Sequence, residues 1–156
     1  MKTKQYTIEI IAALLVLLWI YAAISKLIPY RMSYAQLSIS PYIRDYAAVL
    51  VWLVPAVEIA LCVLLIVPRW RRAGLAGSFI LLTVFTIYII AVLTFRDHPP
   101  CNCGGVISAM SWTQHIFFNL FFMAIAAVGY RLTRNNHNNH TQHIRRFAQT
   151  GEAENL

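Results

Sequence analysis

Four long apolar stretches constrain this chain more than any other feature of its sequence. They cover residues 8–28, 46–67, 73–95 and 112–132. A helix needs about 20 apolar residues to cross the hydrocarbon core of a bilayer, which is about 30 Å thick. Each stretch meets that length and the rest of the chain does not. The sequence therefore predicts an all-α integral membrane protein, built as a four-helix transmembrane bundle.

The overall composition agrees with a membrane protein. Of the 156 residues, 59% are hydrophobic and 12% are charged, against about 45–50% and 25% in soluble domains. The first apolar stretch follows two lysines, as in a signal peptide, but it is too long for one and three more spans follow. We interpret it as an uncleaved helix. Short connections predict one transmembrane domain over residues 1–132, followed by a polar, loosely ordered cytoplasmic tail over 133–156.

The basic residues predict how the chain crosses the membrane. If the N-terminus is cytoplasmic, nine of the thirteen Lys and Arg residues lie inside and four lie outside. The short "PRWRR" turn at residues 68–72 contributes most to this asymmetry, and basic residues favour the cytoplasmic side. Both termini are therefore expected in the cytoplasm. The net charge of +7 follows from this pattern and from anionic lipid headgroups, so we expect no nucleic-acid binding.

Two cysteines, Cys101 and Cys103, stand one residue apart in the segment "HPPCNCGG". The predicted orientation places them on the outer face, where disulfides are permitted. A disulfide between cysteines this close forms a small strained ring, and strained, exposed disulfides tend to be labile and oxidising. This favours thiol–disulfide exchange. A structural turn disulfide and a Cu(I) site with two thiolate ligands stay open as alternatives, whereas two thiolates alone make an incomplete zinc site.

The fourth apolar stretch begins just after these cysteines. Ser111 and Gln114 form a capping-box pattern, which predicts a helix whose first residue is Trp112. The N-terminus of such a helix stabilises a nearby thiolate. His115 and Asn119 are four residues apart and so share one helix face. We expect His115 to shuttle protons or stabilise a thiolate, the alternative being a hydrogen-bonded residue at headgroup level.

An acidic residue, Glu58, lies near the middle of the second stretch, in "WLVPAVEIALCV". Ionisable residues at this depth are costly and usually face a bundle interior or a pathway. We group Glu58 with Asn119 and Lys26 as structural or proton-linked residues inside the membrane. The alternatives are that Glu58 bonds Asn119, Tyr88 or a water as packing, and that Lys26 extends to the headgroups as an interfacial anchor. Cys62 is interpreted as a core residue.

Three motifs occur in order along the chain: "YAAISKL" at 21–27, "PAVEIAL" at 55–61, and "PCNCGG" at 100–105 before a helix with a Trp, a His and an Asn. In these features the chain resembles the DoxX-like group of small four-helix membrane proteins, especially its methylamine-utilisation protein MauE branch. The MauE branch is linked with disulfide formation in an exported amine dehydrogenase. DoxX relatives include the membrane part of a thiosulfate:quinone oxidoreductase. The resemblance implies that Cys101 and Cys103 are a redox pair and that Glu58 is the family's acidic residue.

From these observations we expect a thiol–disulfide oxidoreductase of the bacterial cytoplasmic (inner) membrane. It would exchange electrons between an exported thiol or disulfide protein and a membrane acceptor such as a quinone, and so support disulfide formation in that partner. Cys101 and Cys103 would carry the exchange, and His115 would manage the proton. Aromatic candidates for a quinone slot, which are equally typical of interfacial or packing residues, are Trp19, Trp112 and Phe117.

Two further hypotheses remain. One is a non-enzymatic membrane subunit that docks or assembles an exported oxidoreductase, with the cysteine pair as a structural clip. The other is a metal handler based on the tail histidines His137, His140 and His143, whose spacing would bring them together on a helix. The Asn-rich composition of the tail argues against such a helix, so we expect no metal site.

Overall fold

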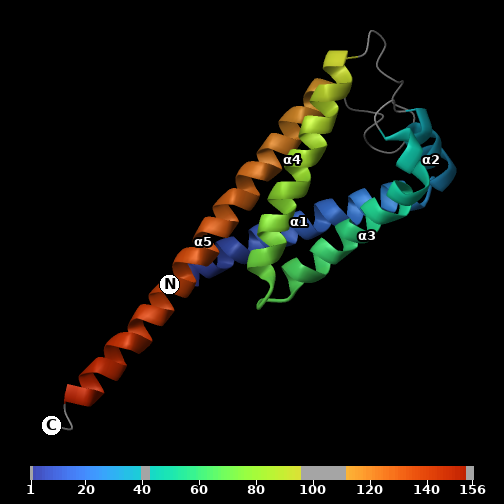
Figure 1. The fold of residues 1–156 in the computed structure, drawn as a ribbon. Helices are drawn as coiled ribbons and strands as arrows, with labels where there is room; N and C mark the ends of the chain where they lie inside the picture. Colours follow the sequence, from blue (N-terminus) through green and yellow to red (C-terminus); the bar gives the residue numbers. More distant parts are fainter. Residues whose placement is uncertain (1, 40–42, 96–111, 154–156) are drawn as a thin grey trace.

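The computed structural model describes residues 2–39, 43–95 and 112–153, and within them all regular structure is helical (Figure 1). The elements are α1 (Lys2–Leu27), α2 (Tyr30–Ile39), a short 3-10 helix η1 (Arg44–Tyr46), α3 (Ala47–Ile66), α4 (Arg71–Phe95) and α5 (Trp112–Ala153). Of these, α1, α3 with η1, α4 and α5 are long and apolar enough to cross a membrane. The predicted all-α fold with four membrane spans is confirmed, and the chain is a multi-pass membrane protein.

The four spans pack chiefly as two pairs. Helix α1 lies along α3, and α4 lies along α5, and the two pairs cross each other at an angle (Figure 1). Lipid tails are as apolar as leucine, so close packing and hydrogen bonds between helices, rather than exclusion of water, hold such a bundle together. The up-and-down order places the C-terminal ends of α1 and α4 at the same end of the bundle as the N-terminal ends of α3 and α5.

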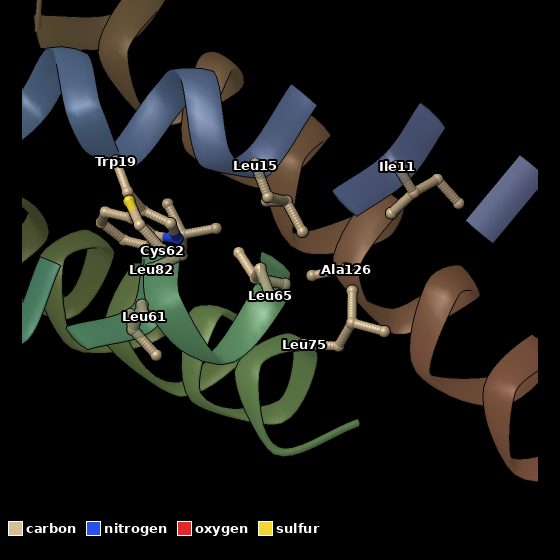
Figure 2. Close-up of a cluster of buried hydrophobic side chains, with 9 residues drawn as sticks. All are labelled: Ile11, Leu15, Trp19, Leu61, Cys62, Leu65, Leu75, Leu82 and Ala126. Atoms are coloured by element: carbon tan, nitrogen blue, oxygen red, sulfur yellow. The ribbon is translucent and has the colours of Figure 1, made fainter. Parts of the chain in front are cut away.

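The core lies where the two pairs meet, and all four spans contribute to it (Figure 2). Its buried members are Ile11, Leu15, Trp19, Leu61, Cys62, Leu65, Leu75, Leu82 and Ala126. Trp19 is the largest of them, and its indole N–H donates a 2.9 Å hydrogen bond to Ser78 Oγ. A buried donor without a partner costs about 1–3 kcal/mol. The bond therefore both satisfies the indole and fixes α1 against α4.

The sequence did not lead us to expect α2. Helix α1 ends at Leu27, and Pro29 follows two residues later. Proline cannot continue the preceding helix but is well suited to the start of the next one. Accordingly the Pro29 carbonyl accepts hydrogen bonds from the backbone N–H groups of Met32 and Ser33, at 2.9 and 3.0 Å. Helix α2 then packs on the N-terminal part of α3.

A close approach of backbones closes the turn between α3 and α4. A Cβ atom on Gly74 would lie 2.9 Å from the backbone nitrogen of Leu65. That separation is too short for any side chain, so glycine lets the first turn of α4 pass directly over the last turn of α3. The nearby Arg71 Nε donates to the Leu65 carbonyl at 3.2 Å, which satisfies one of the free carbonyls at the end of α3.

Helix α5 is longer than its membrane span. The span covers Thr113–Arg134, but the helix continues to Ala153 and projects beyond the bundle (Figure 1). We expected residues 133–156 to form a loosely ordered tail that composition would keep from being helical, and the structure differs over 133–153. The physical reason is that residues 133–150 contain neither proline nor glycine. Asn, His and Thr, which are common in this segment, each destabilise a helix by only a fraction of a kcal/mol relative to alanine.

Candidate functional site

The central feature of the candidate site is an ion pair inside the bundle. Lys26 lies in the last turn of α1, and Glu58 lies near the middle of α3, three residues after Pro55. Lys26 Nζ is 2.7 Å from Glu58 Oε1. The Glu58 side chain is completely buried, and the Lys26 side chain keeps 30% of its exposure. The carboxylate is therefore sealed, and the pair opens to its surroundings only on the lysine side.

Lys26 also contacts its own helix and α4. Its ammonium group donates a second hydrogen bond to the Ala22 carbonyl, at 3.1 Å, and lies 5.8 Å from the centre of the Phe85 ring. A cation over an aromatic face is attracted by the ring quadrupole. Three spans, α1, α3 and α4, thus meet at one charged nitrogen.

This pairing bears on two of the alternatives that the sequence left open. One was that Lys26 extends to the headgroups as an interfacial anchor, and the other was that Glu58 bonds Asn119, Tyr88 or a water as packing. The ammonium group instead turns inward, because a buried carboxylate without a counter-charge would cost several kcal/mol. Asn119 has another partner, Thr86.

The polar residues of α5 lie on one face, as their spacing predicts. Asn119 is 3% exposed, and its Nδ2 donates to Thr86 Oγ1 on α4 at 3.3 Å. One turn earlier His115 is partly buried, and its ring stacks on that of Phe118 with 6.4 Å between the ring centres. Nδ1 of His115 is buried and has no hydrogen-bond partner among the described residues.

The Lys26–Glu58 ion pair and the Asn119–Thr86 hydrogen bond are connected through neighbouring residues of α4. Thr86, which receives the bond from Asn119, follows Phe85, whose ring lies under the Lys26 ammonium group. His115 lies one turn before Asn119 on the same face of α5. We refer to the following polar residues of the four spans as the polar cluster: Lys26, Glu58, Thr86, His115 and Asn119.

The polar cluster holds groups that can bind protons. Glu58 offers a carboxylate, Lys26 an ammonium group 2.7 Å from it, and His115 an imidazole. Oε2 of Glu58, like Nδ1 of His115, is buried without a hydrogen-bond partner in the described part of the chain. Unsatisfied buried polar atoms are uncommon in native proteins, and each one calls for an explanation.

The aromatic candidates for a quinone slot occupy different environments. Trp19 is 1% exposed and held in the core by Ser78, whereas Phe117 is 68% exposed on the outside of α5. Trp112 is the first residue of α5, and its side chain is outside the described residues. Trp19 and Phe117 therefore lie in different environments, and the quinone slot stays a prediction.

The cysteines separate into two groups. Cys62 is a buried core residue, as expected, and its thiol lies 3.8 Å from the Val16 carbonyl of α1. Cys101 and Cys103, on which the redox interpretation rests, lie outside the described residues, in the chain between α4 and α5.

The tail histidines fall on the C-terminal part of α5, where side chains are not described. Within the described side chains, no three His, Cys, Asp or Glu residues come close enough to hold a metal ion. The proposed histidine-based metal site is therefore not addressed by this finding.

Sequence reasoning identified Glu58, Lys26, His115 and Asn119 one by one but missed the pairing of Lys26 with Glu58. The signal was present, because charged residues within membrane spans generally pair with one another. Lys26 and Glu58 carry opposite charges on two neighbouring spans. Thr86 and Ser78 were also missed, since a hydroxyl group in an apolar helix carries little signal before its partner is known.

One comparison with known proteins identifies a relative. A family model described as "Methylamine utilisation protein MauE" matches residues 4–132, which include the polar cluster and all but the end residues of the first and fourth spans. Neither the curated proteins nor the solved structures include a match to this chain.

Proposed function

Because the chain belongs to the methylamine utilisation protein MauE family, we propose that it is a membrane accessory protein that supports disulfide formation in an exported partner. Its reaction is thiol–disulfide exchange at Cys101 and Cys103. The family match is the observation that carries this proposal, because it covers nearly all of the four spans and includes the segment with both cysteines.

The position of the cysteines in the chain supports the proposal. They lie between Phe95, the last residue of α4, and Trp112, the first residue of α5. The helix ends that flank them are at one end of the bundle, and the basic "PRWRR" turn is at the other. By the positive-inside rule the cysteine end faces outward, where an exported protein can meet it and disulfides persist.

The exchange balances as two thiol–disulfide steps. A thiolate of the partner attacks one sulfur of the Cys101–Cys103 disulfide, and the other sulfur leaves as a thiolate, which gives a mixed disulfide. The second partner thiolate then attacks the mixed disulfide and releases the reduced pair. The partner is oxidised, and the pair gains two electrons and, once its thiolates are protonated, two protons.

Renewal of the disulfide requires an acceptor of two electrons. A membrane quinone is the class that we propose, as an expectation from the family resemblance. No residues are assigned to its binding, because Trp19 and Phe117 lie in different environments. His115, one turn into α5, is the residue that we propose to manage protons at this end of the bundle.

Trapping of the partner tests the proposal. Cys101→Ser and Cys103→Ser, made singly, are expected to include one variant that accumulates a mixed disulfide with an exported protein. It would appear as a larger band on a non-reducing gel and disappear on reduction. Cys62→Ser is the matched control, because Cys62 is buried in the core and its replacement should leave the band unchanged. The reduction potential of the pair should lie well above about −300 mV, the upper limit for typical structural disulfides.

The outcome that contradicts exchange is full biological activity of the double variant Cys101→Ser/Cys103→Ser. A potential in the structural range, with no trapped partner, would instead support a docking or assembly subunit. One observation favours that second function: Tyr30, Tyr34 and Trp52 form an exposed aromatic cluster at the cysteine end of the bundle, with the Tyr30 and Trp52 rings 5.3 Å apart. Such a surface suits contact with another protein or with the lipid interface.

A further inference from the structure

The polar cluster contains more hydrogen-bonding capacity than its members use on one another. Glu58 accepts one bond, at Oε1, and its Oε2 is left without a donor among the described residues. His115 Nδ1 is likewise buried without a hydrogen-bond partner among the described residues. Lys26 carries three N–H donors and gives two of them to Ala22 and Glu58.

Leaving these atoms unsatisfied would be expensive. A buried acceptor without a partner costs about 1–3 kcal/mol, and more when it is charged. Two such atoms in the polar cluster would make this region a weak point in an otherwise well-packed bundle. Native proteins commonly resolve this with internal water, which makes about three hydrogen bonds to polar groups that lack other partners.

We propose that Glu58, Lys26 and His115 surround internal water and together form a proton-exchange site inside the membrane. The water donates to Glu58 Oε2, accepts from the remaining N–H of Lys26 and bonds to His115 Nδ1. The inference goes beyond thiol exchange, and it stands without the cysteines, since none of its residues belongs to the segment between α4 and α5.

The surroundings of Glu58 define which groups take part. From α1 the facing charge is Lys26. On α3 itself Cys62 lies one turn after Glu58. From α4 the Phe85 ring faces Lys26, and the next residue, Thr86, bonds Asn119; neither side chain titrates. From α5 the titratable group is His115, one turn before Asn119.

The proton transfer balances without any change of oxidation state. When a proton passes from protonated His115 to Glu58, the Nδ1–H bond breaks and the water oxygen takes that proton. A water O–H bond on the other side breaks as Oε2 becomes protonated. The imidazolium becomes neutral imidazole, the carboxylate becomes a carboxylic acid, and Lys26 neither gives nor takes a proton in this step.

Solid-state NMR of the full chain in lipid bilayers tests the hydration of the site. The chain has four glutamates, Glu9, Glu58, Glu152 and Glu154, so labelling of the glutamate Cδ gives few signals, and Glu58→Gln assigns the one of interest. Magnetisation transferred from water protons should reach Glu58 Cδ about as fast as it reaches that of exposed Glu9. The Trp19 indole, buried but already bonded to Ser78, is the dry control and should receive it far more slowly.

Two variants test the roles of His115 and Lys26. His115→Phe removes one partner of the water and should slow the transfer to Glu58, whereas Phe117→Leu, on the exposed side of the same turn, should not. Lys26→Met should shift the Glu58 signal from the carboxylate to the carboxylic acid position, and Lys4→Met, on the exposed start of α1, should leave it in place.

Two separate results would overturn the inference. No transfer from water to Glu58 in the unmodified chain would exclude internal water, and an unchanged transfer rate in His115→Phe would exclude His115 from the site. The double variant Cys101→Ser/Cys103→Ser should keep every signal. Failure of the thiol chemistry and failure of the proton site are therefore observed separately.

Discussion

Lys26 Nζ, in the last turn of α1, lies 2.7 Å from Glu58 Oε1, in the middle of α3. The two residues are on the two helices of one packed pair, and the Lys26 ammonium group also faces Phe85 on the other pair. In a low-dielectric surrounding, removal of one partner leaves a buried charge uncompensated, and this costs more than the pair itself contributes.

The first prediction follows from this high cost of removing only one partner of the ion pair. Lys26→Met should lower the free energy of unfolding by about 3 kcal/mol, the lower end of the range for breaking a buried pair, since Lys26 is partly exposed. Glu58→Gln should cost less, because it leaves the lysine with a neutral acceptor and a partly open position. Equilibrium unfolding of the purified variants in detergent measures both.

A charge reversal provides the control for this prediction. Glu58→Lys places two ammonium groups side by side and should reduce accumulation in the membrane, while the exchanged pair Lys26→Glu/Glu58→Lys should recover part of the loss. Normal accumulation of Glu58→Lys would mean that Glu58 lies in an exposed place, contrary to its complete burial.

The second prediction concerns the bond between Trp19 and Ser78. Ser78→Ala leaves the indole N–H buried without an acceptor and should destabilise the bundle by about 1–3 kcal/mol. Ser38→Ala is the matched control, since the Ser38 hydroxyl bonds only to a carbonyl of its own exposed helix. Equal effects of the two substitutions on thermal unfolding would show that the bond to Trp19 is not important for packing.

The third prediction compares two helical glycines. Alanine normally stabilises a helix by about 1 kcal/mol relative to glycine. At Gly74, however, the added Cβ would meet backbone atoms of Leu64 and Leu65 at 3.0 and 2.9 Å, which cannot move independently. Gly74→Ala should therefore destabilise the chain by about 1–3 kcal/mol, the usual cost of overpacking.

At Gly129 the added Cβ would meet side-chain atoms, Ile11 Cγ2 and Leu75 Cδ2, at 2.9 and 3.0 Å. Side chains can adjust more easily than the helix backbone, so Gly129→Ala should destabilise the chain less than Gly74→Ala. Thermal unfolding of both variants checks the comparison, and a larger loss at Gly129 than at Gly74 would contradict it.

The fourth prediction concerns topology. A membrane-impermeant maleimide added to intact cells, after mild reduction, should label Cys101 or Cys103 and leave the buried Cys62 unlabelled. Arg69→Cys, in the exposed turn between α3 and α4, provides the opposite control and should react only after the membrane is permeabilised. Labelling of Cys101 and Cys103 only after lysis would reverse the orientation.

The parts of the fold that the sequence predicts well are those determined by local chain properties. The four spans follow from apolar length alone, and the start of α5 at Trp112 follows from the Ser111 and Gln114 pattern. Helix α2 was missed because a ten-residue amphipathic segment after Pro29 has no length signal comparable to a span. The continuation of α5 was missed because we gave the Asn-rich composition more weight than the absence of proline and glycine.

In the candidate site, too, the features that depend on local sequence could be predicted, and the contacts between helices could not. Burial of Glu58 and the shared face of His115 and Asn119 depend on position within one helix, and these could be anticipated. The pairing of Lys26 with Glu58 and of Asn119 with Thr86 depends on the register between helices, which is determined by contacts such as that of Gly74 with α3. Such contacts involve residues far apart in the sequence, and no local pattern specifies them.

The length of α5 has a geometric consequence. At 1.5 Å per residue its 42 residues extend over about 60 Å, roughly twice the thickness of a hydrocarbon core. The helix is thus longer than a bilayer core can hold, and its C-terminal half extends from the bundle as a direct continuation of the span that carries His115 and Asn119.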